Sequence, residues 1–271
     1  MIRNLVNGAL ALACLAWASA GDLAAGAVQS YLNIPSIAGV DGVPGYAGAM
    51  SIPTLTITPH TLTVTKAVDA ASPAIFLATA QGTPTGTVST LLYNGAPGAQ
   101  PDAKLDFFNT TISSYQGNGG TEEFSFNADN PLELYLEVPG IPGVSNTPGH
   151  AGVMRIDSFK LTGNDFTIVK LQDSASDDLF LANAQGVQFA SARLLLYDST
   201  PPGNEPDAVL EFANLLISSS QGIPDPVEPL EQHTFNFQTV SQGVPEPGAA
   251  ALLGAGLLVV GGWRRRGCSR R

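Results

Sequence analysis

The sequence predicts a mainly β protein with two tandem domains, each carrying one short helix. Three observations support this prediction. The chain has 271 residues with 29 Gly and 20 Pro but only 13% charged residues, and this composition favours short strands and turns over long helices. Several segments alternate apolar and polar residues, which is the pattern of half-buried strands. One long stretch of the sequence also occurs twice.

The repeated stretch is Tyr31–Met50, which returns as Tyr135–Met154 with Tyr, Leu, Pro, Gly and Met in step. The spacing is 135 − 31 = 104 residues, and the same spacing, 173 − 69 = 104, joins Asp69–Gly82 to Asp173–Gly186. Solenoid units span about 20–50 residues, so this period indicates a duplicated domain. The shared positions hold few side chains suited to catalysis, which favours a structural or binding role.

The N-terminal segment, residues 1–20, is typical of a secretory signal peptide. Leu5–Trp17 is a run of small and apolar residues, and Ala18 and Ala20 form an A-x-A cleavage site. A buried N-terminal helix and a lipoprotein signal at Cys14 are the alternatives. We therefore expect an exported protein that signal peptidase cleaves after Ala20.

The first domain, residues 31–127, is expected to consist mainly of strands. They are predicted at Tyr31–Ile34, Ser51–Thr58, Leu62–Lys66, Thr87–Tyr93, Ala103–Asn109, Thr111–Tyr115 and Glu122–Asn127. Ser72 as N-cap and Pro73 at the first helical position predict a short helix over Ala74–Ala80. Gly82 is placed to end this helix.

The second domain, residues 135–240, is expected to repeat the same order of elements. Its later strands are predicted at Ser191–Tyr197, Ala208–Ala213, Leu215–Ser219 and Thr234–Thr239. Ser176 and Asp177 are predicted to cap a helix over Asp178–Ala184, which Gly186 ends.

The two copies differ in the length of one loop near the C-terminal end. Aligning Phe124 with Phe235 places the extra residues in Ile223–Gln232, an acidic and Pro-rich stretch. Insertions are tolerated where the backbone is exposed, so this loop is expected on the surface. The link between the domains, Ala128–Glu133, is short and predicts that they are close neighbours.

The C-terminal segment, residues 244–271, has three distinct parts. They are the motif Val244, Pro245, Glu246, Pro247 and Gly248, an apolar run from Ala249 to Trp263, and the cluster Arg264, Arg265 and Arg266. An apolar run stopped by Arg residues predicts a membrane helix with a cytoplasmic C-terminus. A helix over 249–263 would be about 22 Å long, shorter than a bilayer core of about 30 Å.

These three parts, in this order, resemble the PEP-CTERM sorting signal of Gram-negative bacteria. The resemblance implies recognition by an exosortase, transient anchoring in the inner membrane and release to the cell surface. A plain tail anchor is the alternative.

The body of the chain resembles two copies of Hcp, the tube protein of type VI secretion. The resemblance rests on residues 135–163, 166–186, 211–222 and 233–240, and in the first copy on residues 62–82 and 107–117. It implies that each domain is a small β-barrel with one flanking helix. It also implies self-association into rings, which for a two-domain chain would be a pseudo-hexameric ring of three chains. A monomer of two docked domains is the alternative.

The composition excludes several classes of function. Six of the 12 Lys and Arg residues lie in the terminal segments, and the chain has 23 acidic residues, so the acidic body is unsuited to nucleic acid. Cys14 and Cys268 are terminal, so we expect no disulfide or thiolate site in the body. His60, His150 and His233 are scattered and form no metal or catalytic pattern.

Some acidic residues leave chemical alternatives open. Glu122-Glu123 and Asp177-Asp178 suit a solvated face or a helix start, and acid/base catalysis is the alternative. Residues 203–207 could offer oxygen ligands to calcium, but without the spacing of a known loop. We expect no cofactor, no metal and no catalytic residue.

The main functional prediction is a non-enzymatic structural or binding protein that is exported and sorted to the cell surface or extracellular matrix. The alternative is an Hcp-like secreted tube component or carrier.

Overall fold

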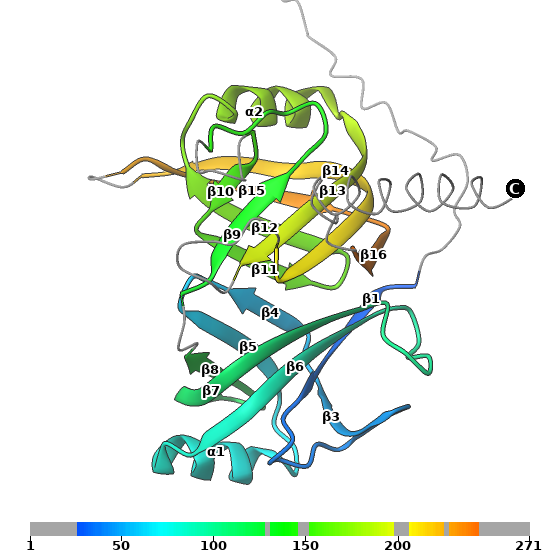
Figure 1. Cartoon of the computed structure of the whole chain (residues 1–271), viewed down its shortest axis with the longest axis vertical. Helices are drawn as coiled ribbons and strands as arrows, with labels where there is room; N and C mark the ends of the chain where they lie inside the picture. The colour runs from blue at the N-terminus through cyan, green and yellow to red at the C-terminus, as the bar shows by residue number, and fades with distance from the viewer. Residues whose placement is uncertain (1–25, 128–130, 146–151, 198–205, 225–227, 244–271) are drawn as a thin grey trace, which may run out of the picture.

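The computed structural model describes residues 26–127, 131–145, 152–197, 206–224 and 228–243 (Figure 1). This part of the chain is mainly β, as predicted, with two helices. The first repeat contains β1 (Val28–Asn33), β2 (Asp41–Val43), β3 (Tyr46–Ser51), β4 (Thr54–Ile57), β5 (Thr61–Ala67), α1 (Ser72–Gln81), β6 (Pro84–Asn94), β7 (Ala103–Asn118) and β8 (Thr121–Asn127). The second repeat contains β9 (Glu133–Glu137), β10 (Met154–Ile156), β11 (Ser158–Thr162), β12 (Asp165–Leu171), α2 (Ser176–Gln185), β13 (Gln188–Tyr197), β14 (Ala208–Ile223), β15 (Leu230–Asn236) and β16 (Thr239–Gln242).

The strands of the two repeats are hydrogen-bonded in the same order. The first repeat runs β4-β5-β8-β7-β6-β1-β3-β2, and the second runs β11-β12-β15-β14-β13-β9-β10. The whole path begins at β10, ends at β2 and does not return to its start, while β16 pairs with β14. The pairings among the described residues therefore do not close into the two separate barrels that we expected. The expectation of closed barrels came from the resemblance to Hcp. In the structure, β4 of the first repeat pairs instead with β11 of the second.

Two of the predicted strand pairs are each a single long strand. β7 covers both segments predicted at 103–115, and β14 covers both segments predicted at 208–219. Asn109 (φ 52°), the last residue before the first predicted break, and Asn214 (φ 54°), at the second, adopt the left-handed conformation, which Asn tolerates better than most residues. Each strand continues through its Asn.

The Gly-rich loop after the first strand of each repeat has one crowded Gly. The N–H of Gly39 donates to the carbonyl of Gly48 at 2.6 Å, and the N–H of Gly143 donates to Gly152 at 2.8 Å. A Cβ at Gly39 would collide with the Gly48 carbonyl, and one at Gly143 would collide with the backbone of Val153. The repeated Gly is needed because the returning strand passes directly over it.

The ends of the helices agree only in part with the sequence prediction. Gly82 (φ 59°) and Gly186 (φ 63°) end the helices in the left-handed conformation, as predicted. The predicted N-caps are wrong, because Ala71 and Ala175 occupy the cap positions without a side-chain hydrogen bond. Both serines are the first residues of their helices, and their hydroxyls have other partners.

The structure also corrects the alignment of the last strands. Thr61 on β5 pairs with Asn127, and its equivalent Asp165 on β12 pairs with Asn236. This register makes the spacing 236 − 127 = 109 residues, so Phe124 corresponds to His233 and not to Phe235. Phe235 and Phe237 have the same spacing as Phe124 and Phe126, so the alignment could shift by two residues, which keeps the same face of a period-two strand.

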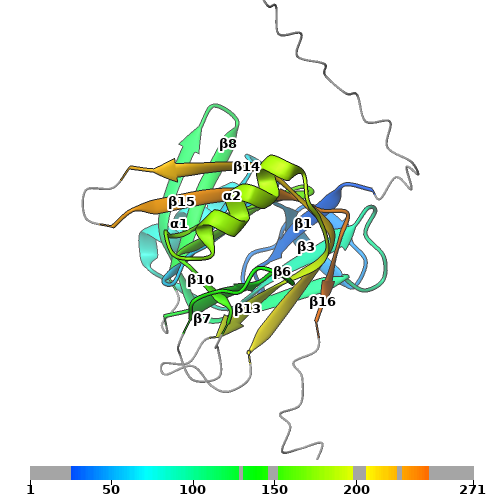
Figure 2. The same ribbon diagram turned by 90° about the horizontal axis from the view of Figure 1, so that it is seen from above.

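The two repeats join edge to edge. β11 pairs with β4 in antiparallel register, with Phe159 opposite Ile57 and Leu161 opposite Leu55. All four side chains are at most 1% exposed and belong to one apolar core that extends through both repeats. The prediction of close neighbours is confirmed. Figure 1 shows α2 and α1 at opposite ends of the long axis, and Figure 2 shows the β14–β15 hairpin extending beyond the body.

The predicted signal peptide and sorting segment lie outside the described residues. Among the residues that the structure does describe, no helix has both the length and the apolar character needed to cross a membrane.

Candidate functional site: a buried lysine cluster present in both repeats

A buried lysine forms the centre of a polar cluster in the first repeat. Nζ of Lys66 lies 2.7 Å from Oε1 of Glu122 and 2.8 Å from Oδ1 of Asp69, and it also donates to the carbonyl of Ala67. The Ser72 hydroxyl donates to the same Glu122 oxygen at 2.9 Å and accepts from the N–H of Asp69. The side chains of Lys66 and Glu122 are 1% and 0% exposed.

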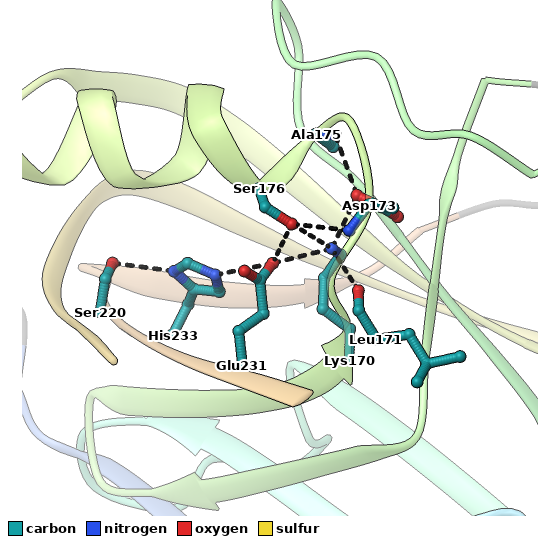
Figure 3. Close-up of polar contacts among 8 residues, drawn as sticks. All are labelled: Lys170, Leu171, Asp173, Ala175, Ser176, Ser220, Glu231 and His233. Atoms are coloured by element: carbon teal, nitrogen blue, oxygen red, sulfur yellow. Dashed lines mark hydrogen bonds and ion pairs between the residues drawn. The ribbon is translucent and has the colours of Figure 1, made fainter. Parts of the chain in front are cut away.

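The second repeat contains the same cluster with nearly the same distances (Figure 3). Nζ of Lys170 lies 2.8 Å from both Glu231 and Asp173, and it donates to the carbonyl of Leu171. The Ser176 hydroxyl donates to Glu231 at 2.9 Å. Both repeats therefore build the cluster from a Lys, an Asp, a Ser and a Glu at corresponding positions.

Strand register brings these side chains together. Lys66 on β5 lies directly opposite Glu122 on β8, and Lys170 on β12 lies directly opposite Glu231 on β15. The chain then leaves the strand and begins its helix six residues after the lysine, which places the serine above the ion pair. The cluster fixes the start of each helix to the end of the strand that precedes it, β5 or β12.

The chemistry of this cluster is structural. Each lysine is held by several oxygens, so it is not available as a nucleophile or base. Charges buried in this way need partners, because leaving one of them unpaired costs about 3–5 kcal/mol. Among the described residues, no group of three or more His, Cys, Asp or Glu side chains could hold a metal ion.

The two clusters differ at one side. In the first repeat, the hydroxyl of Tyr115 donates to Oε2 of Glu122 at 2.7 Å. This hydrogen bond to a carboxylate raises the pKa of Tyr115. In the second repeat Ser220 stands opposite His233 on the strand, where Tyr115 stands opposite Phe124 in the first.

His233 is the most unusual member of the second cluster. Its Nδ1 lies 2.8 Å from the Ser220 hydroxyl, and its ring lies against the ring of Phe180 at 5.2 Å. Nε2 lies 3.1 Å from Oε1 of Glu231, although not in hydrogen-bond geometry, and the other Glu231 oxygen has no hydrogen-bond partner among the described residues. Burial lowers the pKa of His233 against the opposing effect of Glu231. The histidine is therefore neutral near pH 7.

The row Ser220–His233–Glu231 has the residue types of a hydrolytic triad but not the expected environment. His233 is 0% exposed, and Glu231 is already paired with Lys170. The first repeat has the corresponding glutamate, Glu122, but no histidine beside it. The glutamate is therefore explained by its ion pair with the lysine and not by a catalytic triad. A nucleophilic role needs a base that can reach both the nucleophile and the substrate.

The residues singled out from the sequence have different outcomes. Ala18 and Ala20, the motif Val244–Gly248 and the cluster Arg264–Arg266 lie outside the described residues, as does His150. His60 is exposed. Glu122, which was expected on a solvated face, is instead buried in the cluster, because β5 places Lys66 directly opposite it. Asp177 and Asp178 lie in the first turn of α2, as predicted.

Sequence reasoning missed the lysine cluster. A usable signal was present, because Lys66 and Lys170 are among the few cations of the body and their spacing is that of the repeat (170 − 66 = 104). Each is followed at matching positions by an Asp and a Ser. The glutamates were not recognised as their partners because the alignment of the last strands was shifted.

A shallow groove of about 400 Å³ runs beside α2. Ile141, Leu181 and Phe189 contribute apolar surface to it, and Asp178 is its one charged lining residue. Such a lining does not define a particular ligand.

The second repeat matches a known protein family. The family "Type VI secretion system effector, Hcp" matches residues 135–243. These residues are therefore an Hcp-like domain. No curated protein matches the chain.

Several solved structures are similar to part of the chain. Hcp1 from Salmonella typhimurium is 18% identical, with a TM-score of 0.37, over 40% of this chain and 83% of that chain. A type VI secretion system effector from Yersinia pestis is 17% identical, with a TM-score of 0.33, over 38% and 82%. Secreted protein Hcp3 from Pseudomonas aeruginosa is 18% identical, with a TM-score of 0.33, over 41% and 89%.

Proposed function

We propose that this protein is an exported, non-enzymatic protein with two Hcp-like domains that self-associates, as a tube component or carrier related to type VI secretion. The observation that carries the proposal is the family match over residues 135–243. The first repeat has the same strand order as the matched domain, which supports extending the likeness to residues 31–127. Hcp proteins assemble into hexameric rings, so ring formation is the activity we expect.

The composition of the two clusters supports a non-enzymatic role. Both place their charged side chains in the interior, where they hold the helix to the sheet. His233 distinguishes the second cluster. It is buried against the ring of Phe180 and lies beside a glutamate that is already paired with Lys170. Each set of paired charges ties the start of one helix to one position on the sheet, and loss of one partner would leave an uncompensated buried charge.

Electron microscopy of the purified body tests this proposal. Residues 21–243 contain every described helix and strand. We expect ring-shaped particles with a central opening, and stacks of such rings at high protein concentration. Single two-domain particles at every concentration and salt level would contradict the proposal. Salt must be varied because the acidic body repels its own copies, and this repulsion is screened over about 8 Å at physiological ionic strength.

A second candidate function is a surface-sorted structural protein, favoured by the motif Val244–Gly248 and the arginines at 264–266. It predicts that exosortase processing removes the C-terminal segment after signal peptidase has removed residues 1–20. Intact-mass analysis of the protein from its native host tests this prediction. Loss of both ends is expected, and Glu246→Ala should leave the C-terminal segment attached. Recovery of the full-length mass in the cytosol would contradict it.

A further inference from the structure

The contact between the repeats has an internal two-fold symmetry. β4 and β11 are equivalent strands of the two repeats. Their first residues, Thr54 and Ser158, are separated by the repeat spacing, 158 − 54 = 104. They pair antiparallel, and Thr56 lies opposite Lys160. These two residues are themselves equivalent, since 160 − 56 = 104. The two-fold axis of the pairing therefore passes between Thr56 and its equivalent, Lys160.

The side chains around this centre follow the same symmetry. Leu55 lies opposite Leu161, and the symmetric pair, made by the equivalent residues, is Phe159 opposite Ile57. All four are buried in the shared core. On the other face of the ladder, the hydroxyls of Thr54 and Thr162 lie 3.5 Å apart.

Two hydrogen bonds outside the β4–β11 pairing show the same two-fold symmetry. The N–H of Val28 at the start of β1 donates to Oδ1 of Asn164, in the turn between β11 and β12, at 2.8 Å. The N–H of Leu132 donates to the carbonyl of Pro59, in the turn between β4 and β5, at 2.6 Å. Val28 and Leu132 are equivalent, since 132 − 28 = 104. Each repeat therefore holds the corresponding turn of the other.

From these contacts we infer that this strand edge, β4 in one repeat and β11 in the other, is a surface that binds a second copy of the same domain. Within one chain, the other repeat occupies it. A contact in which both partners use the same patch is isologous and closes on itself. Because β4 also pairs with β5, and β11 with β12, neither strand has an edge left for a further copy. One chain is thus a closed two-domain unit, equivalent to a homodimer joined by a linker.

Further hydrogen bonds join the two repeats through β16. Asn94 of the first repeat exchanges two hydrogen bonds of 2.8 Å with the backbone of Val240 in β16. The N–H of Gln242 donates to the carbonyl of Asp102, and its side-chain Oε1 accepts from the N–H of Lys104. The last strand of the second repeat therefore also holds the first repeat.

This inference alters the stoichiometry of any ring, a consequence that rests on the proposed function. Neighbours in a six-membered ring differ by a rotation of about 60° and use two different patches, which is a heterologous contact. The two-fold contact within this chain cannot serve as such a step. The two repeats would therefore lie in different rings, and each ring would need six chains instead of three.

Disulfide trapping tests the two-fold contact without requiring a ring. Residues opposite each other in an antiparallel ladder have Cα atoms about 4.5–5.5 Å apart, within the range that a disulfide spans. Thr56→Cys with Lys160→Cys in the full chain, with Cys14→Ser and Cys268→Ser, is expected to form a disulfide within one chain. Peptide mass analysis after mild oxidation of dilute protein would identify it.

The matched control is Thr63→Cys with Thr167→Cys, which are equally equivalent positions on β5 and β12. Because β4 and β11 lie between them, they are three strand spacings or about 14 Å apart, and no disulfide is expected. Thr54→Cys with Thr162→Cys is a second test pair, in case the first variant does not fold. The inference is overturned if neither test pair is linked in folded protein, if the links form only between chains, or if the control pair is linked equally.

Discussion

His233 in the second repeat occupies the position of Phe124 in the first, and the residues opposite them on the neighbouring strand, Ser220 and Tyr115, are also equivalent. Phe124 lies opposite Tyr115, whose hydroxyl binds Glu122, whereas His233 lies opposite Ser220 and binds it directly. The two repeats thus provide an internal comparison. The two lysine clusters have the same geometry, but the residues beside the glutamate differ, with Tyr115 in the first repeat and His233 in the second. The shared part and the differing part are therefore tested separately below.

The first prediction concerns the buried lysines. Lys66→Met and Lys170→Met should each lower the free energy of unfolding by about 3–5 kcal/mol, because each leaves a buried glutamate without its cation. Urea denaturation would measure the loss. Lys104→Met is the matched control, since Lys104 pairs with Asp106 at 2.9 Å near the surface and such pairs contribute about 0–1 kcal/mol. Equal effects of the three variants would contradict the structural role of the cluster.

The second prediction concerns acid sensitivity. The folded-state pKa of His233 is lowered mainly by burial, so the unfolded state takes up the proton at a higher pH, near 6.5. The stability that the neutral histidine contributes is complete above about pH 6.5 and is lost as pH falls towards the folded-state pKa. His233→Phe, which restores the residue of the first repeat, should reduce the loss of stability between pH 7.5 and 5. Parallel losses in the two proteins would show that His233 is not responsible.

The third prediction concerns the crowded glycines. Gly39→Ala and Gly143→Ala should each cost about 1–3 kcal/mol, because a Cβ at either position overlaps backbone atoms of the returning strand. Gly42→Ala is the control, since no atom lies within 4 Å of its Cβ position and its φ is not positive. Thermal unfolding of the three variants would compare them. A larger loss for Gly42→Ala than for the other two would refute the steric explanation.

The fourth prediction concerns enzymatic activity. A panel of ester, peptide and glycoside substrates should give no turnover above the uncatalysed rate, because His233 is buried and Glu231 is paired with Lys170. The informative control is Ser220→Ala, which removes the hydroxyl beside His233. Turnover in the parent protein that disappears in Ser220→Ala would establish a hydrolytic site there.

Much of the fold could be predicted from local pattern. Alternation located the strands, and Gly82 and Gly186 marked the helix ends because only Gly adopts their left-handed conformation readily. The N-caps were missed because Ser72 and Ser176 bond to glutamates that lie 122 − 72 = 50 and 231 − 176 = 55 residues further along the chain. Such partners are set by strand register, which local sequence does not specify.

The joining of the repeats was also beyond local pattern. Thr54–Ile57 has the alternation of any half-buried strand, and nothing in it distinguishes a partner in the same repeat from one in the other. The choice of partner follows from tertiary packing, in which Leu55 and Ile57 share a core with Phe159 and Leu161. The predicted processing sites depend on segments outside the described residues and remain predictions.

The mass of the assembly in solution tests the central claim most directly. Sedimentation velocity of residues 21–243, over a wide range of protein concentration and at low and high salt, would measure it. The account predicts a concentration-dependent species with the mass of six chains or a multiple of six. A constant mass of one chain under all of these conditions would contradict self-association, and a closed species of three chains would contradict the two-fold arrangement of the repeats.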